Sequence, residues 1–179
     1  MLIGVLGNKG HGKDTIADYI CEKYNYKKDA FANPLKEACR ILFNLSDEQL
    51  YGDQKEVVDP HWNVSPREIL RHVGTEFFRI NIDKLLPGIY NNFWVKCMEP
   101  RLDDNTIISD VRFQNEVNMI HEHGGVVIKV IRSYEDSKSI KSLHVSEQLD
   151  DISFDFLIHN DSTLEELYKK VDLIYKSIN

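Results

Sequence analysis

Apolar and polar residues follow one another along the chain in short blocks, and these blocks predict strands that alternate with helices. Residues 2–6 form an apolar run that stops at a glycine, and residues 126–131 form the clearest such run in the chain. Short aliphatic runs bounded by glycine or polar residues are typical of buried parallel strands. On this basis we expect strands over residues 2–6, 28–31, 106–109, 126–131 and 154–159.

Helical spacing of apolar residues fills most of the stretches between those strands. Residues 14–24 repeat an apolar side chain every four positions, and residues 164–178 repeat one every three or four. Asn33-Pro34 and Ser65-Pro66 each predict a helix start, with a capping residue followed by proline. The predicted helices cover residues 14–24, 33–43, 66–80, a part of 89–102, 115–123 and 164–178, whereas residues 46–61 are expected to be irregular.

Strands that alternate with helices predict the fold class. We expect an α/β fold with three layers, α/β/α, around a central parallel five-stranded sheet. The chain shows no internal repeat and no linker, so one domain over residues 1–179 is expected. In the helix after Pro66, the spacing of four apolar residues predicts one shared face, made by Ile69, Val73, Phe77 and Ile80.

Composition and charge narrow the classes of partner. Of the 179 residues, 42% are hydrophobic and 28% are charged, as in globular proteins. A formal net charge of −7 argues against a general grip on a nucleic acid polymer or an anionic membrane, although a local cluster of donors could bind a small anion. Cys21, Cys39 and Cys97 are far apart, and no apolar run reaches the length of a membrane span or a signal peptide. We therefore expect a soluble cytoplasmic protein that binds small molecules.

Residues 7–15 carry the clearest chemical motif of the chain. Between the first strand and the first helix, the segment Gly7-Asn8-Lys9-Gly10-His11-Gly12-Lys13-Asp14-Thr15 matches the pattern G-x-x-x-x-G-K. Glycines allow turns that point successive N–H groups into one concave nest, and the N-terminal end of the helix attracts phosphate. Lys13 adds a mobile positive charge for the β- and γ-phosphates. We expect this loop to bind a nucleoside triphosphate.

Asp14 stands where this pattern normally has a serine or threonine, whose hydroxyl binds Mg²⁺. A carboxylate there can hold the metal through water, and Thr15 offers a hydroxyl one residue later. Alternatively, Asp14 is only an anion at a helix N-terminus, where the helix dipole favours it.

Short motifs spread over nearly the whole chain resemble one family, the deoxynucleoside monophosphate kinases of bacteriophages. The resemblance implies a P-loop kinase fold like that of the nucleoside monophosphate kinases, with a helical region for the acceptor nucleotide over about residues 33–102. It also implies phosphoryl transfer from ATP to a deoxynucleoside monophosphate with Mg²⁺, as a supply of DNA precursors, often in a homodimer and, for a phage protein, in the host cytoplasm. The motifs are Gly12-Lys13-Asp14-Thr15, Phe31-Ala32-Asn33-Pro34-Leu35-Lys36-Glu37-Ala38, Gly74-Thr75-Glu76, Trp94-Val95-Lys96, Ser109-Asp110-Val111-Arg112, Val130-Ile131-Arg132, His144-Val145-Ser146-Glu147 and the stretch from Asn160 to Leu167.

Phosphoryl transfer is accelerated mainly by alignment and by cations near the transferred group, so basic residues from several segments are candidates. We expect Lys13, Arg112 and Arg132 to be catalytic, and Arg132 to contact ATP as well. Alternatively, Arg112 forms a surface salt bridge with Glu116, and Arg132 is a solvated side chain at a loop edge.

Two further features complete the predicted donor side. Asp110, at the carboxyl end of a strand, is a metal candidate through water, or else it caps the next helix. The polar segment 133–147 is expected to close as a lid, because water competes as phosphoryl acceptor. Its candidate phosphate contacts, each of which could equally be a solvated side chain, are Lys138, Lys141 and His144.

The acceptor monophosphate needs donors of its own. Arg67 and Arg71 are four residues apart and share a helical face, or else they belong to a solvated face with Glu68. Lys36 and Arg67 also match positions of the resembling family. The predicted acceptor-binding residues are Lys36, Arg67, Arg71 and Arg79 for the phosphate and Phe31 for the base, whereas Trp62, Phe77 and Phe78 are aromatic residues at spacings more typical of a core.

Two other functions stay open from the sequence. One is another small-molecule kinase of the same fold that resembles phosphomevalonate kinase, and the other is a nucleotide-dependent switch or hydrolase. The chain has no Asn-Lys-x-Asp signature for guanine, which disfavours a GTP-driven switch.

Overall fold

The computed structural model describes residues 1–132, 149 and 151–178, and the chain divides into two compact units. Unit 1 comprises residues 1–30 and 101–179, and unit 2 comprises residues 31–100. The chain therefore leaves unit 1 once and returns to it once. Among the described residues, no helix combines the length and the apolar character that crossing a membrane requires.

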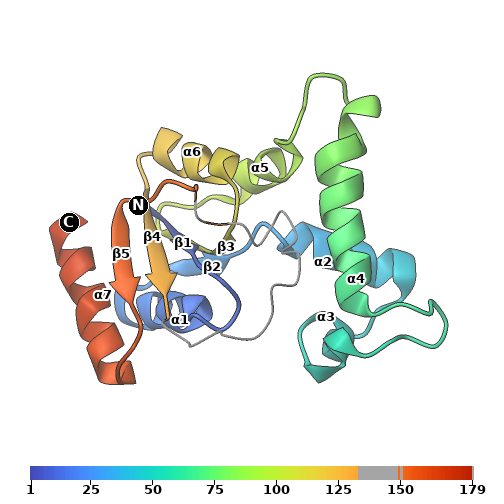
Figure 1. The fold of residues 1–179 in the computed structure, drawn as a ribbon. Coiled ribbons are helices and arrows are strands. Elements are labelled where there is room, and N and C mark those ends of the chain that lie inside the picture. The colour runs from blue at the N-terminus through green and yellow to red at the C-terminus, as the bar shows by residue number, and fades with distance from the viewer. Residues whose placement is uncertain (133–148, 150, 179) are drawn as a thin grey trace. The chain divides into compact units, whose positions relative to one another are not determined.

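Unit 1 is built on a parallel sheet of five strands in the order β2-β3-β1-β4-β5 (Figure 1). The strands pair in parallel throughout, so the predicted all-parallel sheet is confirmed. The central strand lies between β3 and β4, with Ile3 opposite both Ile107 and Val126. The strand bounds are β1 Leu2–Leu6, β2 Lys27–Asp29, β3 Thr106–Val111, β4 Val126–Ile131 and β5 Phe156–His159.

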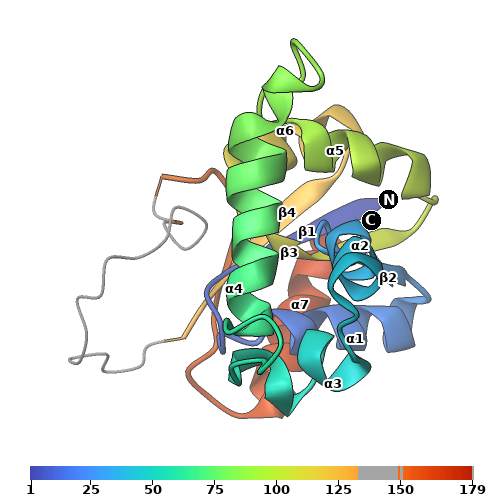
Figure 2. The same ribbon diagram turned by 90° about the vertical axis from the view of Figure 1, so that its right-hand side faces the viewer.

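Helices cover both faces of this sheet. One face packs against α1 (Lys13–Tyr24) and α7 (Leu164–Ile178), and the other against α6 (Gln114–Glu122), as the two views show (Figure 1, Figure 2). The first face carries a buried aliphatic core, and on the second face the side chain of Ile120 fills the space above Gly4. This arrangement confirms the predicted three-layer α/β/α class. The core of the first face consists of Ile3, Val5, Ile16, Ala17, Ile20, Tyr26, Ile107, Ile128, Val130, Ile158, Leu167 and Val171.

A tyrosine cluster joins α7 to α1. Tyr19 stacks on Tyr168 with ring centroids 3.9 Å apart, and Tyr24 stacks on Tyr175 at 3.6 Å. The Asp172 carboxylate accepts hydrogen bonds from both Tyr19 and Tyr24, at 2.9 and 2.7 Å. Stacked rings and a shared carboxylate add directional contacts to the aliphatic packing, so the C-terminal helix is fixed along the helix that follows the phosphate-loop motif.

Strand β2 differs from its predicted bounds for an electrostatic reason. It ends at Asp29, a buried carboxylate that forms an ion pair with Arg101, whereas the sequence predicts a strand as far as Phe31. Arg101 Nε and Nη2 donate to the Asp29 carboxylate at 3.0 and 3.2 Å. The N–H of Ala30 donates to Asp29 at 2.7 Å and its carbonyl accepts from Arg101 at 2.9 Å, so Ala30 cannot extend the ladder. The predicted strand end at Phe31 is therefore wrong.

Unit 2 is helical. Ser65 caps α4 as predicted, with its hydroxyl accepting from the N–H of Glu68 and the Glu68 carboxylate accepting from the N–H of Ser65. Ala32 is the N-cap of α2, so the expected capping role of Asn33, the first helical residue, is wrong. The elements are α2 Asn33–Phe43, α3 Asp47–Leu50, the 3₁₀ helix η1 Asp53–Glu56, α4 Pro66–Arg71, the π-helix η2 His72–Asn81, the 3₁₀ helix η3 Ile82–Lys84 and α5 Phe93–Met98, with the 3₁₀ turn η4 Glu99–Arg101 leading back to unit 1.

Two further expectations for unit 2 are wrong. Residues 46–61 hold two short helices, the first of which starts with a capping box between Ser46 and Gln49. The face predicted after Pro66 breaks up, because α4 continues as a π-helix whose hydrogen bonds span one residue more than those of an α-helix. Ile69 is buried, whereas Phe77 and Ile80 are 59% and 64% exposed.

Candidate active site

The loop between β1 and α1 depends on glycine at three positions. Gly10 and Gly12 have φ angles of 83° and 100°, in the left-handed region that larger residues disfavour. A Cβ atom on Gly7 would lie 2.6 Å from the carbonyl oxygen of Val130 in β4. Gly12 is also the N-cap of α1 and offers no side chain to the first N–H groups of that helix. These donors, at the positive end of α1, fit an anion.

Lys13 is the buried cation of this loop. It is 8% exposed, and its Nζ donates to the carbonyl oxygen of Asn8 at 2.8 Å. Burial, followed by the positive charge of Arg112, lowers the pKa of Lys13 from 10.5 to about 8, although Asp14 and Asp110 act in the opposite direction. The ammonium group is thus held against the loop by a neutral carbonyl that a phosphate oxygen can replace, because the bond is stronger when donor and acceptor carry opposite charges.

Asp110 and Arg112 lie at the carboxyl end of β3, beside the loop strand β1. The Glu116 carboxylate accepts from the backbone N–H groups of Arg112 and Phe113 at 2.8 and 3.2 Å, and it is only 2% exposed. Phe113 is the N-cap of α6, so the alternative capping role of Asp110 is wrong. Glu116 fixes the backbone from which the Arg112 side chain extends, a role that the sequence did not indicate.

Oxygen donors for a divalent cation are present at the start of α1. Asp14 Oδ1 lies 2.9 Å from Lys28 Nζ, and Thr15 is half-buried in the following position. Together with Asp110 these residues supply carboxylate and hydroxyl oxygens, the ligand class that Mg²⁺ prefers, and Mg²⁺ usually combines one or two carboxylates with waters and phosphates. The described residues hold no cluster of three or more acidic, histidine or cysteine side chains that could bind a metal, so a magnesium ion here would also need substrate oxygens. The donor set fits that kind of site.

A cavity of about 380 Å³ adjoins the loop within unit 1. Arg132, which follows β4, and Asn160, which follows β5, come to it from the same carboxyl edge of the sheet as Lys13. Ligands of open parallel sheets bind at that edge. Asn160 was not among the predicted site residues, although its position directly after the last strand could have suggested it. The lining residues are Gly10, Gly12, Lys13, Asp14, Thr15, Arg132, Asn160, Ser162, Leu164 and Leu167.

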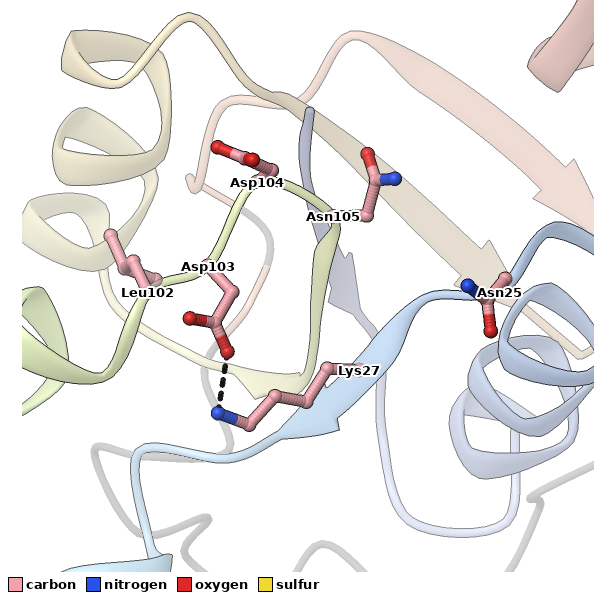
Figure 3. Close-up of a pocket in the computed structure, with 6 residues that line it drawn as sticks. All are labelled: Asn25, Lys27, Leu102, Asp103, Asp104 and Asn105. Carbon is pink, nitrogen blue, oxygen red and sulfur yellow. Dashed lines mark hydrogen bonds and ion pairs between the residues drawn. The ribbon is translucent and has the colours of Figure 1, made fainter.

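A second cavity of unit 1, of about 440 Å³, lies at the amino ends of β2 and β3 (Figure 3). Lys27 and Asp103 form an exposed ion pair there, with Nζ and Oδ2 2.6 Å apart. Parallel sheets bind ligands at the opposite edge, so this cavity is not the candidate site. Its lining residues are Asn25, Lys27, Leu102, Asp103, Asp104 and Asn105.

The predicted acceptor residues all belong to unit 2. Arg67 and Arg71 lie on α4, where Arg67 pairs with Glu56 at 3.0 Å and Arg71 is exposed. The Lys36 ammonium, on α2, lies 4.1 Å from the ring centre of Tyr51. Each of these three cations is at least partly exposed on its helix, so each can reach an anion.

Arg79 and Phe31 have different surroundings. Arg79, on η2, is 9% exposed, and its Nη1 donates to the carbonyl oxygen of Asn91 at 3.4 Å. Phe31 is 5% exposed and lies in a turn two residues beyond β2, so the reason for choosing it as a strand end does not hold. An apolar cavity of about 830 Å³ in this unit is lined instead by Phe77 and Phe78, among others. The predicted lid over residues 133–147, with Lys138, Lys141 and His144, lies outside the described residues.

Comparisons with known proteins identify relatives over the whole length. The sequence model of the family described as deoxynucleotide monophosphate kinase matches residues 53–171. A protein of Acanthamoeba polyphaga mimivirus, whose name provisionally assigns it to the same kinases, is 40% identical over 184 residues, covering 96% of this chain and 94% of the relative. The deoxynucleotide monophosphate kinase of Enterobacteria phage T4 is 29% identical over 122 residues, or 64% of this chain and 46% of the relative.

More distant likenesses concern other phosphoryl acceptors. A dephospho-CoA kinase of Fusobacterium nucleatum is 26% identical over 200 residues and covers 99% of this chain and 98% of the relative. The structure is similar to shikimate kinase from Aquifex aeolicus, with a TM-score of 0.53 at 13% identity, over 99% of this chain and 97% of the other. At that identity the likeness concerns the fold alone, and it confirms the predicted P-loop kinase architecture.

Proposed function

Because this chain belongs to the deoxynucleotide monophosphate kinase family, we propose that it transfers the γ-phosphoryl group of ATP to a deoxynucleoside monophosphate, which gives the diphosphate and ADP. One observation within the site supports this most directly. The buried ammonium of Lys13 and the uncapped N-terminus of α1 face the same loop, at the carboxyl edge of a parallel sheet. This arrangement suits a chain of phosphates better than any other small anion.

The residues of unit 1 divide the donor side among them. Residues 7–15 hold the phosphates through main-chain N–H groups, and Lys13 neutralises charge on the β- and γ-phosphates. Arg112 and Arg132 stabilise the group in transfer, and Arg132 also holds ATP. Arginine suits this work because its guanidinium stays protonated and binds phosphate oxygens in pairs.

In the proposed reaction, magnesium binds together with the phosphates of ATP. Asp14, Thr15 and Asp110 would hold it, in part through water, and when bound it withdraws charge from the β- and γ-phosphate oxygens. Lys28 pairs with Asp14, so it limits the orientations open to that carboxylate. The chain itself orients the nucleotide.

The acceptor side is proposed for unit 2. Lys36 and Arg67 are the main proposed contacts of the monophosphate. Arg71 and Arg79 are further donors to it, and Phe31 contacts the base. We also propose that residues 1–179 act as one domain, with an acceptor region over about residues 33–102, and that the protein forms a homodimer. It is proposed to act on free nucleotides in the cytoplasm, which for a viral protein is the cytoplasm of the host cell.

A panel of acceptors tests the reaction class. In a coupled assay with ATP and Mg²⁺, we expect turnover with at least one of dTMP, dGMP, dAMP and dCMP. Because one relative is a dephospho-CoA kinase, dephospho-CoA joins the panel, together with mevalonate 5-phosphate for the phosphomevalonate kinase alternative. Turnover with either of these instead of the nucleotides would replace the proposal, and phosphate release without any acceptor would favour a hydrolase.

Lys13→Ala tests the loop. We expect turnover to fall at least about a hundredfold, as for the loss of one group that stabilises transition-state charge. Lys176→Ala, which removes an exposed lysine on α7, is the matched control and should keep wild-type turnover. Thermal melting of both variants shows that they are folded. Normal turnover of folded Lys13→Ala would refute the proposed mechanism.

A further inference from the structure

Asn160 contacts the backbone of the phosphate loop from the far end of the sequence. It follows β5, and its backbone N–H donates to the carbonyl oxygen of Ile131 in β4 at 2.8 Å. Its side-chain Nδ2 donates to the carbonyl oxygen of His11 at 2.9 Å. The residue is 9% exposed. Only the amide nitrogen can donate to a carbonyl, so this contact also fixes which way the side-chain amide is turned.

The same side chain lies against the next residue of the loop. A Cβ atom on Gly12 would come within 2.6 Å of Asn160 Nδ2, and the φ of Gly12 is 100°. The absence of a side chain at position 12 therefore has two causes, backbone conformation and the space that Asn160 occupies. Loop and amide are closely packed, so a change in one is transmitted to the other.

The hydrogen bond fixes a peptide plane that serves the proposed site. His11 and Gly12 share one peptide bond, and no cis peptide occurs among the described residues. In a trans peptide the carbonyl and the N–H point in opposite directions from one rigid plane. With the His11 carbonyl held by Asn160, the Gly12 N–H must point to the other side. Main-chain N–H groups of this loop are the proposed ligands of the triphosphate.

We propose that Asn160 is a positioning residue for the donor nucleotide: it binds the His11 carbonyl and thereby orients the Gly12 N–H toward the phosphates. It acts through the loop and need not touch the ligand. The inference rests on the proposed function, because the oriented donor has a purpose only if this loop binds a phosphate chain.

Asn160→Ala and Asn160→Asp test the proposal through phosphate affinity. Both remove the donor, and the carboxylate also repels the His11 carbonyl and the phosphates. Titration calorimetry with inorganic tripolyphosphate should show a dissociation constant raised about tenfold in Asn160→Ala, equivalent to about 1.4 kcal/mol, and raised further in Asn160→Asp. Asn118→Asp adds the same charge on the exposed face of α6, where the side-chain oxygen accepts a bond from Gln114, and should bind like wild type.

Steady-state kinetics separate positioning from general damage. We expect KM for ATP to rise in both Asn160 variants, while KM for the accepted deoxynucleoside monophosphate stays within about twofold of wild type. Equal rises in both KM values, or unchanged tripolyphosphate affinity, would overturn the proposal. If wild-type protein itself bound neither tripolyphosphate nor ATP, the proposed function would fail instead, so the two failures are distinguishable.

A measurement on wild-type protein covers the case in which the variants do not fold. In ¹⁵N-labelled protein, we expect the Gly12 amide proton to move downfield when tripolyphosphate is added, because it gains a charged acceptor. A Gly12 resonance that stays in place while other loop amides move would contradict the proposed orientation.

Discussion

For the proposed binding of ATP, the pKa of Lys13 predicts an affinity that depends on pH in a range where most lysines stay charged. At about 8, this pKa lies well below the ordinary value of 10.5, because of burial and then Arg112. The ammonium form binds phosphate, and the negative charge of a bound phosphate raises the pKa again. When the pH rises through 8, Lys13 therefore loses its proton in the free protein but keeps it in the complex, so binding requires the uptake of a proton. The affinity for ATP should therefore fall as the pH rises.

The size of the effect follows from the fraction of binding-competent protein. With a pKa of about 8, about nine-tenths of free Lys13 is protonated at pH 7 and about one-tenth at pH 9. Apparent affinity scales with the competent fraction, so the dissociation constant for ATP should rise about tenfold across this range, or about 1.4 kcal/mol. ATP contributes little, because the second ionisation of a phosphate group lies near pH 6.

Titration calorimetry in two buffers of different ionisation enthalpy measures both quantities. We expect about half a proton to be taken up per ATP bound near pH 8, where free Lys13 is half protonated. The control is Lys13→Arg, whose guanidinium stays charged throughout. That variant should bind ATP with no change in affinity between pH 7 and 9. A wild-type affinity that is equally flat would show that burial does not lower this pKa, and an equal decline in the variant would assign the titration to another group.

Three other substitutions test the fold of the two units. Arg101→Met removes the guanidinium that neutralises the buried Asp29 carboxylate and should lower the free energy of unfolding by about 3–5 kcal/mol in urea titration, whereas a loss below about 1 kcal/mol would show that water replaces the guanidinium. Ser65→Ala removes the buried capping hydroxyl of α4 and should cost about 1 kcal/mol in the same assay; no loss would mean that the cap is redundant. Gly7→Ala places a Cβ atom 2.6 Å from the backbone oxygen of Val130 and should lower both the melting temperature and the ATP affinity, and wild-type values for both would contradict the packing described.

Local sequence signals were sufficient for the loop and for most of the sheet. The phosphate loop depends on glycines and a lysine at fixed spacing between a strand and a helix, and all of these can be found by inspection. β1 is buried throughout and β4 is buried at three of its six residues, and the predicted bounds of both strands agree with the structure. Where burial alone determines an element, the pattern of the sequence predicts it.

Contacts between distant segments were the part that no local pattern could predict. The end of β2 depends on Arg101, which follows it by 72 residues, and the His11 carbonyl depends on Asn160, 149 residues further on. The π-helix η2 likewise changes which residues share a face, although its ten residues include no proline and only one glycine, Gly74. In β2 and η2, a tertiary contact or a rare hydrogen-bond pattern overrides the strand or helical periodicity.

Two buried side chains, one of them from a distant segment, hold the backbone of the proposed donor site. Asn160 binds the carbonyl of His11, and Glu116 binds the N–H of Arg112, each through a buried side chain. A site whose ligands are main-chain N–H groups cannot be adjusted by changing the side chains of those residues, because every residue offers the same N–H group. Its geometry must be imposed by neighbours that bond the remaining carbonyl and amide groups. Residues that act through the backbone should therefore control the affinity for the proposed nucleotide, and Asn160 and Glu116 are the positions at which to look for that control.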